Sequence, residues 1–257
     1  MSAASHAVSA ISLEPELSGD KSITHRAYLL GLLARGETTV WNPNRGEDCE
    51  ATLTAVGRLG ASVIPGEAVR LAGTGGILRP PDGPLDLGNS GTGMRLLLGV
   101  LAGQPFTATL TGDASLSARP MERVLEPLRV MGVSANSTAG HPPLEITGGA
   151  LSGHTHHLRV PSAQVKSALL LAGLAARGRT AVHGAFPSRD HTERMLRAFG
   201  ATLDASPEVI TLDGPQSLQG TEVRVPADPS AATFYLVALG LVGQGRVVLR
   251  AVSQNPT

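Results

Sequence analysis

Four apolar stretches dominate the pattern of hydrophobic and polar positions along the chain. Each follows a turn that contains Gly or Ser, is apolar on every side at helical spacing, and leads through a glycine into a β-branched run. They cover residues 27–34, 96–102, 168–176 and 231–242, and their internal glycines Gly31, Gly99, Gly173 and Gly240 are 68, 74 and 67 residues apart. The pattern predicts a structural unit that repeats about every seventy residues.

A second series of helices with one polar face alternates with the apolar ones. These amphipathic stretches cover residues 47–61, 119–133 and 188–201, and their closing glycines Gly60, Gly132 and Gly200 are 72 and 68 residues apart. The predicted strands between them mix Thr, Arg, Glu and His with Val, Ile and Leu, which is typical of sheets with one face in water. Each unit is therefore predicted to run helix, strand, helix, strand, strand. The apolar helices lie at the centre and the sheets lie outside.

An ordinary doubly wound α/β domain is the alternative fold. In such a domain the parallel strands are buried on both faces and are the most apolar elements. Here the first helix of each unit is more apolar than any strand, so the repeat with central helices is favoured.

Composition and charge narrow the classes of function. The 257 residues are 42% hydrophobic, enough for a substantial core, and 21 basic residues balance 21 acidic ones. This balance argues against a nucleic-acid-binding protein or one that binds a membrane surface through a basic patch. The single cysteine, Cys49, excludes a disulfide within the chain and indicates the cytoplasm. Residues 1–18 lack the basic and apolar segments of a signal peptide, and no apolar run has the length of a membrane span, so we expect neither.

Basic and small polar residues gather where helices are predicted to begin. They are Lys21, His25 and Arg26 in the first unit, Asn89, Gly91 and Arg95 in the second, Ser162, Gln164 and Lys166 in the third, and Arg119 and Arg189 before two amphipathic helices. Helix N-termini carry partial positive charge, so cations there are unfavourable unless an anion joins them. Such turns commonly hold phosphate or carboxylate. The pattern therefore predicts several anion-binding positions that face one cleft.

Local ion pairs are the alternative explanation for these cations. Lys21 follows Asp20 directly, and Arg189 lies near Asp190 and Glu193 in the sequence. Either pairing would satisfy the charge without a ligand. Because the same placement recurs in every unit, the anion cleft is favoured.

Two other motifs are weak. The GDKS turn at residues 19–22 lacks the first glycine of a phosphate-binding P-loop, so it gives no support to ATP chemistry. His154 and His156 share one face of a predicted strand, but no third ligand stands at a suitable spacing. We therefore predict no metal site.

Six motifs carry a specific resemblance. They are GDKSITHR (19–26), LGNSGTGMR (87–95), ARPM (118–121), SAQVKSALLLAGL (162–174), SRDHTERML (188–196) and VPADPSAATF (225–234). In this order they resemble the 5-enolpyruvylshikimate-3-phosphate synthase family, in its class II branch, from residue 19 onward. The resemblance implies an α/β fold, the inside-out α/β barrel of enolpyruvyl transferases. That fold has pseudo-threefold βαβαββ units with buried parallel helices and outer sheets.

The resemblance also implies a reaction and its binding residues. The family transfers the enolpyruvyl group of phosphoenolpyruvate to the 5-hydroxyl of shikimate 3-phosphate and releases phosphate, without cofactor or metal. The matching positions for shikimate 3-phosphate are Lys21, Ser22, Arg26, Ser162, Ala163, Gln164 and Arg189. Those for phosphoenolpyruvate are Lys21, Gly91, Arg119 and Gln164. Both partners are small anions, and the full-length protein is expected to be a monomer.

The resemblance divides the chain into three segments. Residues 1–18 match an N-terminal strand and hinge, residues 19–242 a substrate-binding domain, and residues 243–257 the start of a second domain. The last three residues, NPT, match a signature just before its arginine, so the chain is expected to carry about half of the site. The acid and base groups are expected beyond Thr257. Asp228 stands at a matching helix start, where it either joins the site or caps the helix.

Two rival functions remain. A UDP-N-acetylglucosamine enolpyruvyl transferase of similar fold would carry a cysteine in a loop, whereas Cys49 lies in the helix-like segment EDCEATL. The second rival belongs to another class of function. It is a non-catalytic domain that binds shikimate 3-phosphate without converting it. Titration with each substrate together with a phosphate-release assay separates these functions.

Overall fold

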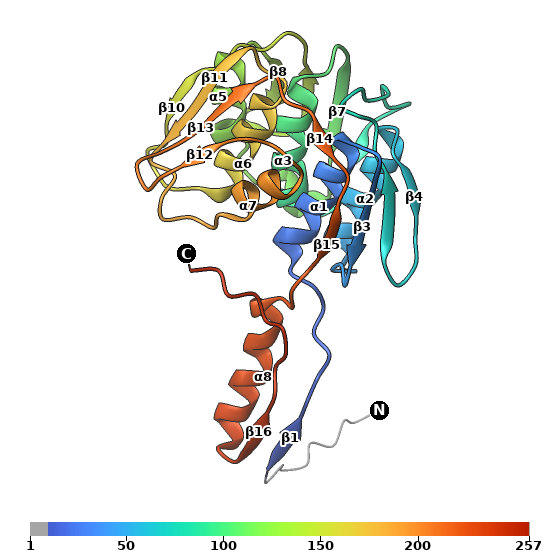
Figure 1. The fold of residues 1–257 in the computed structure, drawn as a ribbon, viewed down its shortest axis with the longest axis vertical. Helices are drawn as coiled ribbons and strands as arrows, with labels where there is room; N and C mark the ends of the chain where they lie inside the picture. Colours follow the sequence, from blue (N-terminus) through green and yellow to red (C-terminus); the bar gives the residue numbers. More distant parts are fainter. Residues whose placement is uncertain (1–9, 257) are drawn as a thin grey trace.

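The computed structural model describes residues 10–256. Its body consists of helices surrounded by three four-stranded sheets. An extension formed by α8 (Pro229–Val242), β16 (Gly245–Val247) and β1 (Ile11–Leu13) projects from one end (Figure 1). Within residues 10–256, none of the helices has the length and hydrophobicity that a membrane crossing needs.

Three units of similar order build the body. The first contains α1 (Lys21–Leu33), β2 (Ala34–Arg35), β3 (Glu37–Trp41), α2 (Glu47–Arg58), β4 (Ser62–Ile64) and β5 (Val69–Ala72). The second contains β6 (Leu85–Asp86), α3 (Gly91–Ala102), β7 (Thr107–Thr111), α4 (Ala114–Ser117), α5 (Glu122–Val130), β8 (Ser134–Thr138) and β9 (His141–Thr147). The third contains β10 (Thr155–His157), α6 (Ala163–Gly173), β11 (Gly178–His183), α7 (His191–Ala198), β12 (Asp204–Ala205) and β13 (Val209–Gly214). The predicted repeat is confirmed.

The three sheets share one topology. Their strand orders are β15-β3-β5-β4, β6-β7-β9-β8 and β10-β11-β13-β12, with the first pair parallel and the other two antiparallel. The first strand of the first unit is β15 (Glu222–Arg224), which comes from the far end of the body. A short parallel pair, β14 (Leu218–Gln219) with β2, also joins the end of the third unit to the first. The chain therefore closes the threefold arrangement by returning to its first sheet.

The first helix of each unit is buried on all sides, as its apolar pattern predicts. In α1 residues 24–32 are all buried, in α6 residues 165–173, and in α3 every residue except Thr92. Helices α3 and α6 touch at Gly99, where an added Cβ would lie 2.2 Å from the Ala168 carbonyl oxygen. Burying each leucine side chain of this core contributes about 1.5–3 kcal/mol. The centre of the body is thus apolar, and the sheets present their polar faces to water.

Each central helix begins at a residue whose side chain caps its first turn. Asp20 accepts a hydrogen bond from the backbone nitrogen of Ile23 at 2.9 Å, and Ser90 from Gly93 at 3.1 Å. Ser162 caps α6 through the backbone nitrogen of Val165 at 3.4 Å. The N-terminal turns of all three buried helices are therefore fixed by sequence-local contacts.

The extension corrects one predicted boundary. The resemblance assigns residues 19–242 to the substrate-binding domain, and the apolar pattern predicts a central helix over residues 231–242. Instead, α8 (Pro229–Val242) projects from the body and packs on β16 (Gly245–Val247), which pairs in parallel with β1 (Ile11–Leu13) (Figure 1). Only Ala232 of α8 is buried, and Phe234 is 79% exposed. Residues 1–9 of the predicted N-terminal strand and hinge lie outside the described residues.

Two chain segments connect the extension to the body side by side. The backbone nitrogen of Asp20 donates to the Pro226 carbonyl at 2.8 Å, and that of Asp228 donates to the Ser18 carbonyl at 3.0 Å. We therefore place the boundary of the body near residues 18–20 and 225–228. The helix α8 begins directly after it.

Candidate functional site

The starts of α1, α3 and α7 meet the start of α8 around a cavity of about 310 Å³. Its walls hold Lys21 and Ser22 from α1, Thr92 from α3, Arg189 and His191 from the start of α7, Asp228 and Ser230 from the start of α8, and Ser253 and Asn255 from the C-terminal segment. Three of the residues predicted for shikimate 3-phosphate, Lys21, Ser22 and Arg189, are thus brought together. The first turns of α1, α3 and α6 contain no acidic residue, although the carboxylates of Asp20 and Asp228 accept hydrogen bonds at the start of α1.

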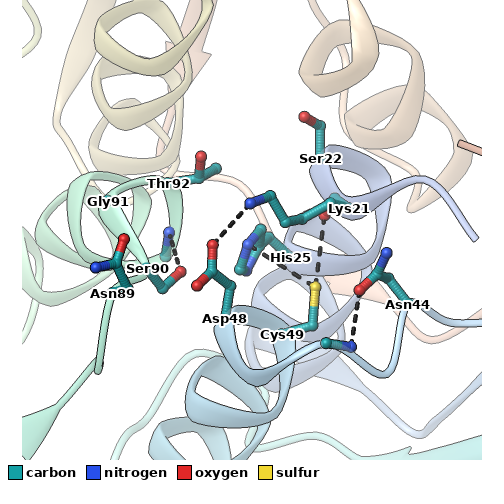
Figure 2. A network of polar contacts seen from close by, with 12 residues as sticks. Lys21, Ser22, His25, Asn44, Asp48, Cys49, Asn89, Ser90, Gly91 and Thr92 are labelled. Carbon is teal, nitrogen blue, oxygen red and sulfur yellow. Dashed lines mark hydrogen bonds and ion pairs between the residues drawn. The ribbon is translucent and has the colours of Figure 1, made fainter. Parts of the chain in front are cut away.

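Lys21 pairs with an acid that sequence neighbourhood does not indicate. Its Nζ lies 2.7 Å from Oδ2 of Asp48 in the first turn of α2, with the side chains 48% and 22% exposed (Figure 2). The alternative pairing with Asp20 is wrong, because Asp20 caps α1. The Lys21 ammonium is therefore held at the edge of the cavity and remains open to solvent.

Arg189 reaches across to α1. Its Nη1 donates to Ser22 Oγ at 3.2 Å. The alternative local partners are engaged elsewhere, since Asp190 pairs with Arg194 at 2.7 Å and Glu193 with Lys166 at 2.6 Å. Arg189 is thus free to offer its other donors to an anion in the cavity.

Gln164 connects the start of α6 to the start of α3. Its amide nitrogen donates to Thr92 Oγ1 at 2.9 Å, and its amide oxygen accepts from Arg95 Nη1 at 2.9 Å and Arg123 Nη2 at 3.2 Å. Arg119 lies on the same side and donates to Ser115 Oγ at 3.3 Å and to the amide oxygen of Asn89.

Gly91 leaves room for two arginine side chains beside the start of α3. A Cβ added to Gly91 would lie 2.9 Å from Arg119 Nη1 and 3.1 Å from Arg95 Nη1. The absence of a side chain therefore lets two guanidinium groups approach the first turn of α3. Of the residues predicted for phosphoenolpyruvate, Gly91 and Arg119 are neighbours. Gln164 is joined to them through Arg95, which also approaches Gly91.

Arg26 is buried next to Ser22, a residue of the cavity wall. It is 3% exposed, and its three nitrogens donate to Thr192 Oγ1 at 2.7 Å, the Ser22 carbonyl at 2.7 Å and Ser167 Oγ at 2.8 Å. In this structure Arg26 supports Ser22, and its direct contact with a ligand stays a prediction.

Cations crowd one another around the site. Burial and the neighbouring Arg189 lower the pKa of Arg26 to about 10. Burial, Arg123 and Arg119 likewise lower the pKa of Arg95 to about 10. A guanidinium pKa falls when the charged form lacks compensation, so a bound anion would relieve this crowding. The electrostatics favour an anionic ligand.

The remaining predicted residues lie toward a larger cavity of about 650 Å³ between α5 and β10. Ser162 lines this cavity and caps α6, while Ala163 is the first residue of that helix. His154 and His156, the candidate strand pair, also line it, with ring centroids 5.3 Å apart. The smaller cavity is the better candidate site, because Lys21, Ser22 and Arg189 meet there at the starts of two helices.

Sequence reasoning missed Asp48 and Thr92 as members of the site. Asp48 belongs to the acidic first turn of α2, a position where acids ordinarily serve the helix dipole. Thr92 stands within the quoted LGNSGTGMR motif but carries no charge that would have singled it out. Asp228 has the capping role, since its carboxylate accepts from the Ser230 nitrogen at 2.8 Å, and also from the Lys21 nitrogen at 3.1 Å.

The three units with central helices and outer sheets define the class of protein: an enolpyruvyl transferase fold, the inside-out α/β arrangement. The chain belongs to the EPSP synthase (3-phosphoshikimate 1-carboxyvinyltransferase) family, whose model matches residues 6–257.

Curated relatives and solved structures agree with this family. The chain is 51% identical over 248 residues to the 3-phosphoshikimate 1-carboxyvinyltransferase of Alkalilimnicola ehrlichii, covering 93% of this chain and 55% of that protein. It is 46% identical over 254 residues to that of Bacillus velezensis, covering 97% and 59%. The EPSP synthase structure from Acinetobacter baumannii matches with a TM-score of 0.89 and 46% identity over 96% of this chain and 57% of that chain. The chain therefore spans little more than half the length of these relatives.

Proposed function

We propose that this chain forms the shikimate 3-phosphate half of a 3-phosphoshikimate 1-carboxyvinyltransferase. The observation that carries the proposal is the meeting of Lys21, Ser22 and Arg189 at helix starts around one cavity. Such a cavity suits a ligand with one phosphate and one carboxylate. The relatives that are named for this activity support the same assignment.

The binding residues are proposed as two overlapping groups. Lys21, Ser22, Arg26, Ser162, Ala163, Gln164 and Arg189 are proposed to hold shikimate 3-phosphate. Lys21, Gly91, Arg119 and Gln164 are proposed to hold phosphoenolpyruvate. Lys21 and Gln164 belong to both groups, which is compatible with two ligands that lie side by side.

In the reaction a carbon–oxygen bond forms between the 5-oxygen of shikimate 3-phosphate and the central carbon of phosphoenolpyruvate. The bond from that carbon to the phosphate oxygen breaks, and the proton of the 5-hydroxyl ends on the released phosphate. This chain's residues orient both anions and offset their charges. Holding the two reactants together contributes much of the rate enhancement in reactions of this kind. We assign no general acid or base to residues 1–257, and we propose that these groups lie in the part of the relatives that the chain does not span.

Cys49 gives no support to the rival UDP-N-acetylglucosamine enolpyruvyl transferase. The thiol is fully buried in α2, and burial raises its pKa to about 12. A reactive thiol needs an exposed position and a lowered pKa. We further propose a cytoplasmic protein that uses no cofactor and is a monomer at full length.

Isothermal titration of the chain with each anion tests the proposal. Shikimate 3-phosphate is expected to bind more tightly than phosphoenolpyruvate, and binding should weaken as salt screens the ion contacts. Arg189→Ala should weaken shikimate 3-phosphate, whereas Arg179→Ala, which alters an exposed pair with Asp213, should not. Equal affinities for the two anions, or affinity independent of salt, would mean that the half-site is wrongly assigned. Tight binding to a full-length protein that shows no turnover would favour the non-catalytic rival.

A further inference from the structure

A buried ion pair lies behind the turn that carries Arg189, and the proposed binding groups do not include it. Lys166 Nζ lies 2.6 Å from Glu193 Oε1, and the two side chains are 2% and 4% exposed. The pair joins α6 to α7 across the interior. Because both ions lose their hydration, a pair buried this deeply contributes little net stability. The other contacts of Lys166 indicate the role of the pair.

The Lys166 ammonium also holds the backbone of the turn before α7. Its Nζ donates to the Arg189 carbonyl at 3.0 Å and lies 3.4 Å from the Ser188 carbonyl. These two carbonyls flank the residue whose guanidinium reaches Ser22. The turn lies between β11 and α7 and has no ladder of its own, so these bonds fix its path.

The next residues of α7 are held by the same helix and by α1. Thr192 Oγ1 accepts from Arg26 Nε at 2.7 Å and shares a hydrogen bond with Ser167 Oγ at 2.6 Å. Ser167 follows Lys166 on α6, so two neighbouring residues of that helix contact the turn before α7 and the first turn of α7. Hydrogen bonds are directional, whereas apolar packing is not, so this network sets where the turn stands relative to α1.

We propose that Lys166 and Glu193 are positioning residues for the phosphate of shikimate 3-phosphate. Lys166 fixes the turn that presents the Arg189 guanidinium, and Glu193 neutralises Lys166 so that the ammonium can stay buried there. This inference rests on the proposed function. Since none of the residues proposed for phosphoenolpyruvate stands on this turn, the pair affects one substrate and leaves the other unchanged.

A double variant separates positioning from stability. Lys166→Met alone leaves the Glu193 carboxylate buried without its cation and is expected to destabilise the chain. Lys166→Met combined with Glu193→Met replaces the pair by apolar side chains of similar size, so the melting temperature should stay close to that of the parent and above that of Lys166→Met alone. Affinity for shikimate 3-phosphate should still fall about tenfold, because the two carbonyls have lost a charged donor. Affinity for phosphoenolpyruvate should not change.

Arg179→Gln combined with Asp213→Asn is the matched control. It removes an exposed ion pair of 2.7 Å in the same unit and should change neither affinity. If the double variant at the buried pair binds shikimate 3-phosphate as well as the parent does, the pair is merely structural and the inference is overturned. Should that variant not fold, Glu193→Gln, which removes the negative charge that neutralises the buried ammonium, replaces it. It should weaken shikimate 3-phosphate alone, and unchanged binding overturns the inference.

Hydrogen exchange distinguishes failure of the inference from failure of the proposed function. If the parent chain does not bind shikimate 3-phosphate, the proposed function fails. The positioning role is then judged on ligand-free protein by exchange of the amides in residues 184–191. Faster exchange in the double variant than in the parent and the control supports positioning, and equal exchange overturns it.

Discussion

The Lys21 ammonium and the Asp48 carboxylate meet 2.7 Å apart, one from the first turn of α1 and the other from the first turn of α2 (Figure 2). Both side chains are partly exposed beside the cavity. An exposed pair of this kind adds little to stability. An anion that binds Lys21 must therefore share the ammonium with the Asp48 carboxylate or displace that carboxylate.

Asp48→Asn should therefore raise the affinity of the chain for phosphoenolpyruvate. Loss of a competing carboxylate of this exposure is worth about 1 kcal/mol, or roughly fivefold in affinity. Titration at low salt should show the gain, and high salt should remove it. Asp82→Asn, which breaks the exposed pair of Asp82 with Arg58 at 2.6 Å, is the control. Weaker binding by Asp48→Asn would show instead that the carboxylate is needed to place Lys21.

Leu170→Ala and Lys21→Ala should differ sharply in stability. Leu170 is fully buried in α6, so its truncation opens a cavity and should lower the free energy of unfolding by about 2–5 kcal/mol. Lys21→Ala breaks only a partly exposed pair and should change it by less than about 1 kcal/mol. Urea unfolding of both variants measures the difference. A large loss in Lys21→Ala would mean that the lysine serves the fold rather than a ligand.

The chain should lose stability as pH falls below about 6.5. Burial and Arg26 lower the pKa of His25 from 6.5 to about 3, so its imidazole stays neutral in the folded protein, 2.9 Å from Thr52 Oγ1. The unfolded chain binds a proton at this histidine below pH 6.5, whereas the folded chain does so only near pH 3. Stability is therefore present above pH 6.5 and is lost toward pH 3.

His25→Gln tests this pH dependence. Between pH 6.5 and about 4 the parent should lose about 3 kcal/mol more free energy of unfolding than the variant does. Urea unfolding across this range measures both slopes. Identical slopes would show that His25 is protonated in the folded state as readily as in the unfolded one.

The chain should be inactive alone and active when joined to the rest of a relative. Fusion of this chain to the C-terminal part of the Alkalilimnicola ehrlichii protein that it does not span should restore phosphate release from the two substrates. Lys21→Ala or Arg119→Ala in the fusion should abolish that turnover while the melting temperature stays close to the parent's. Robust turnover by the chain alone would contradict the half-site assignment.

The repeat and its buried helices are evident in the sequence itself. An α-helix that is apolar on every side has no surface it can leave in water, so the patterns around Gly31, Gly99 and Gly173 predict central helices without any coordinates. Asp20 and Ser162 cap their own helices through contacts three residues away, so this part of the fold depends on local sequence. The quoted motifs, in their order, predict the family.

Tertiary structure alone decided which groups face one another. Lys21 has Asp20 beside it in sequence yet pairs with Asp48, and Lys166 reaches Glu193 on another helix, because charges select partners by distance in space. The apolar pattern of residues 231–242 predicts another central helix, and that prediction is wrong for α8. An apolar pattern indicates that a surface is unfavourable in water, but it does not determine what covers that surface. Here the paired segments at Asp20 and Pro226 direct α8 away from the body.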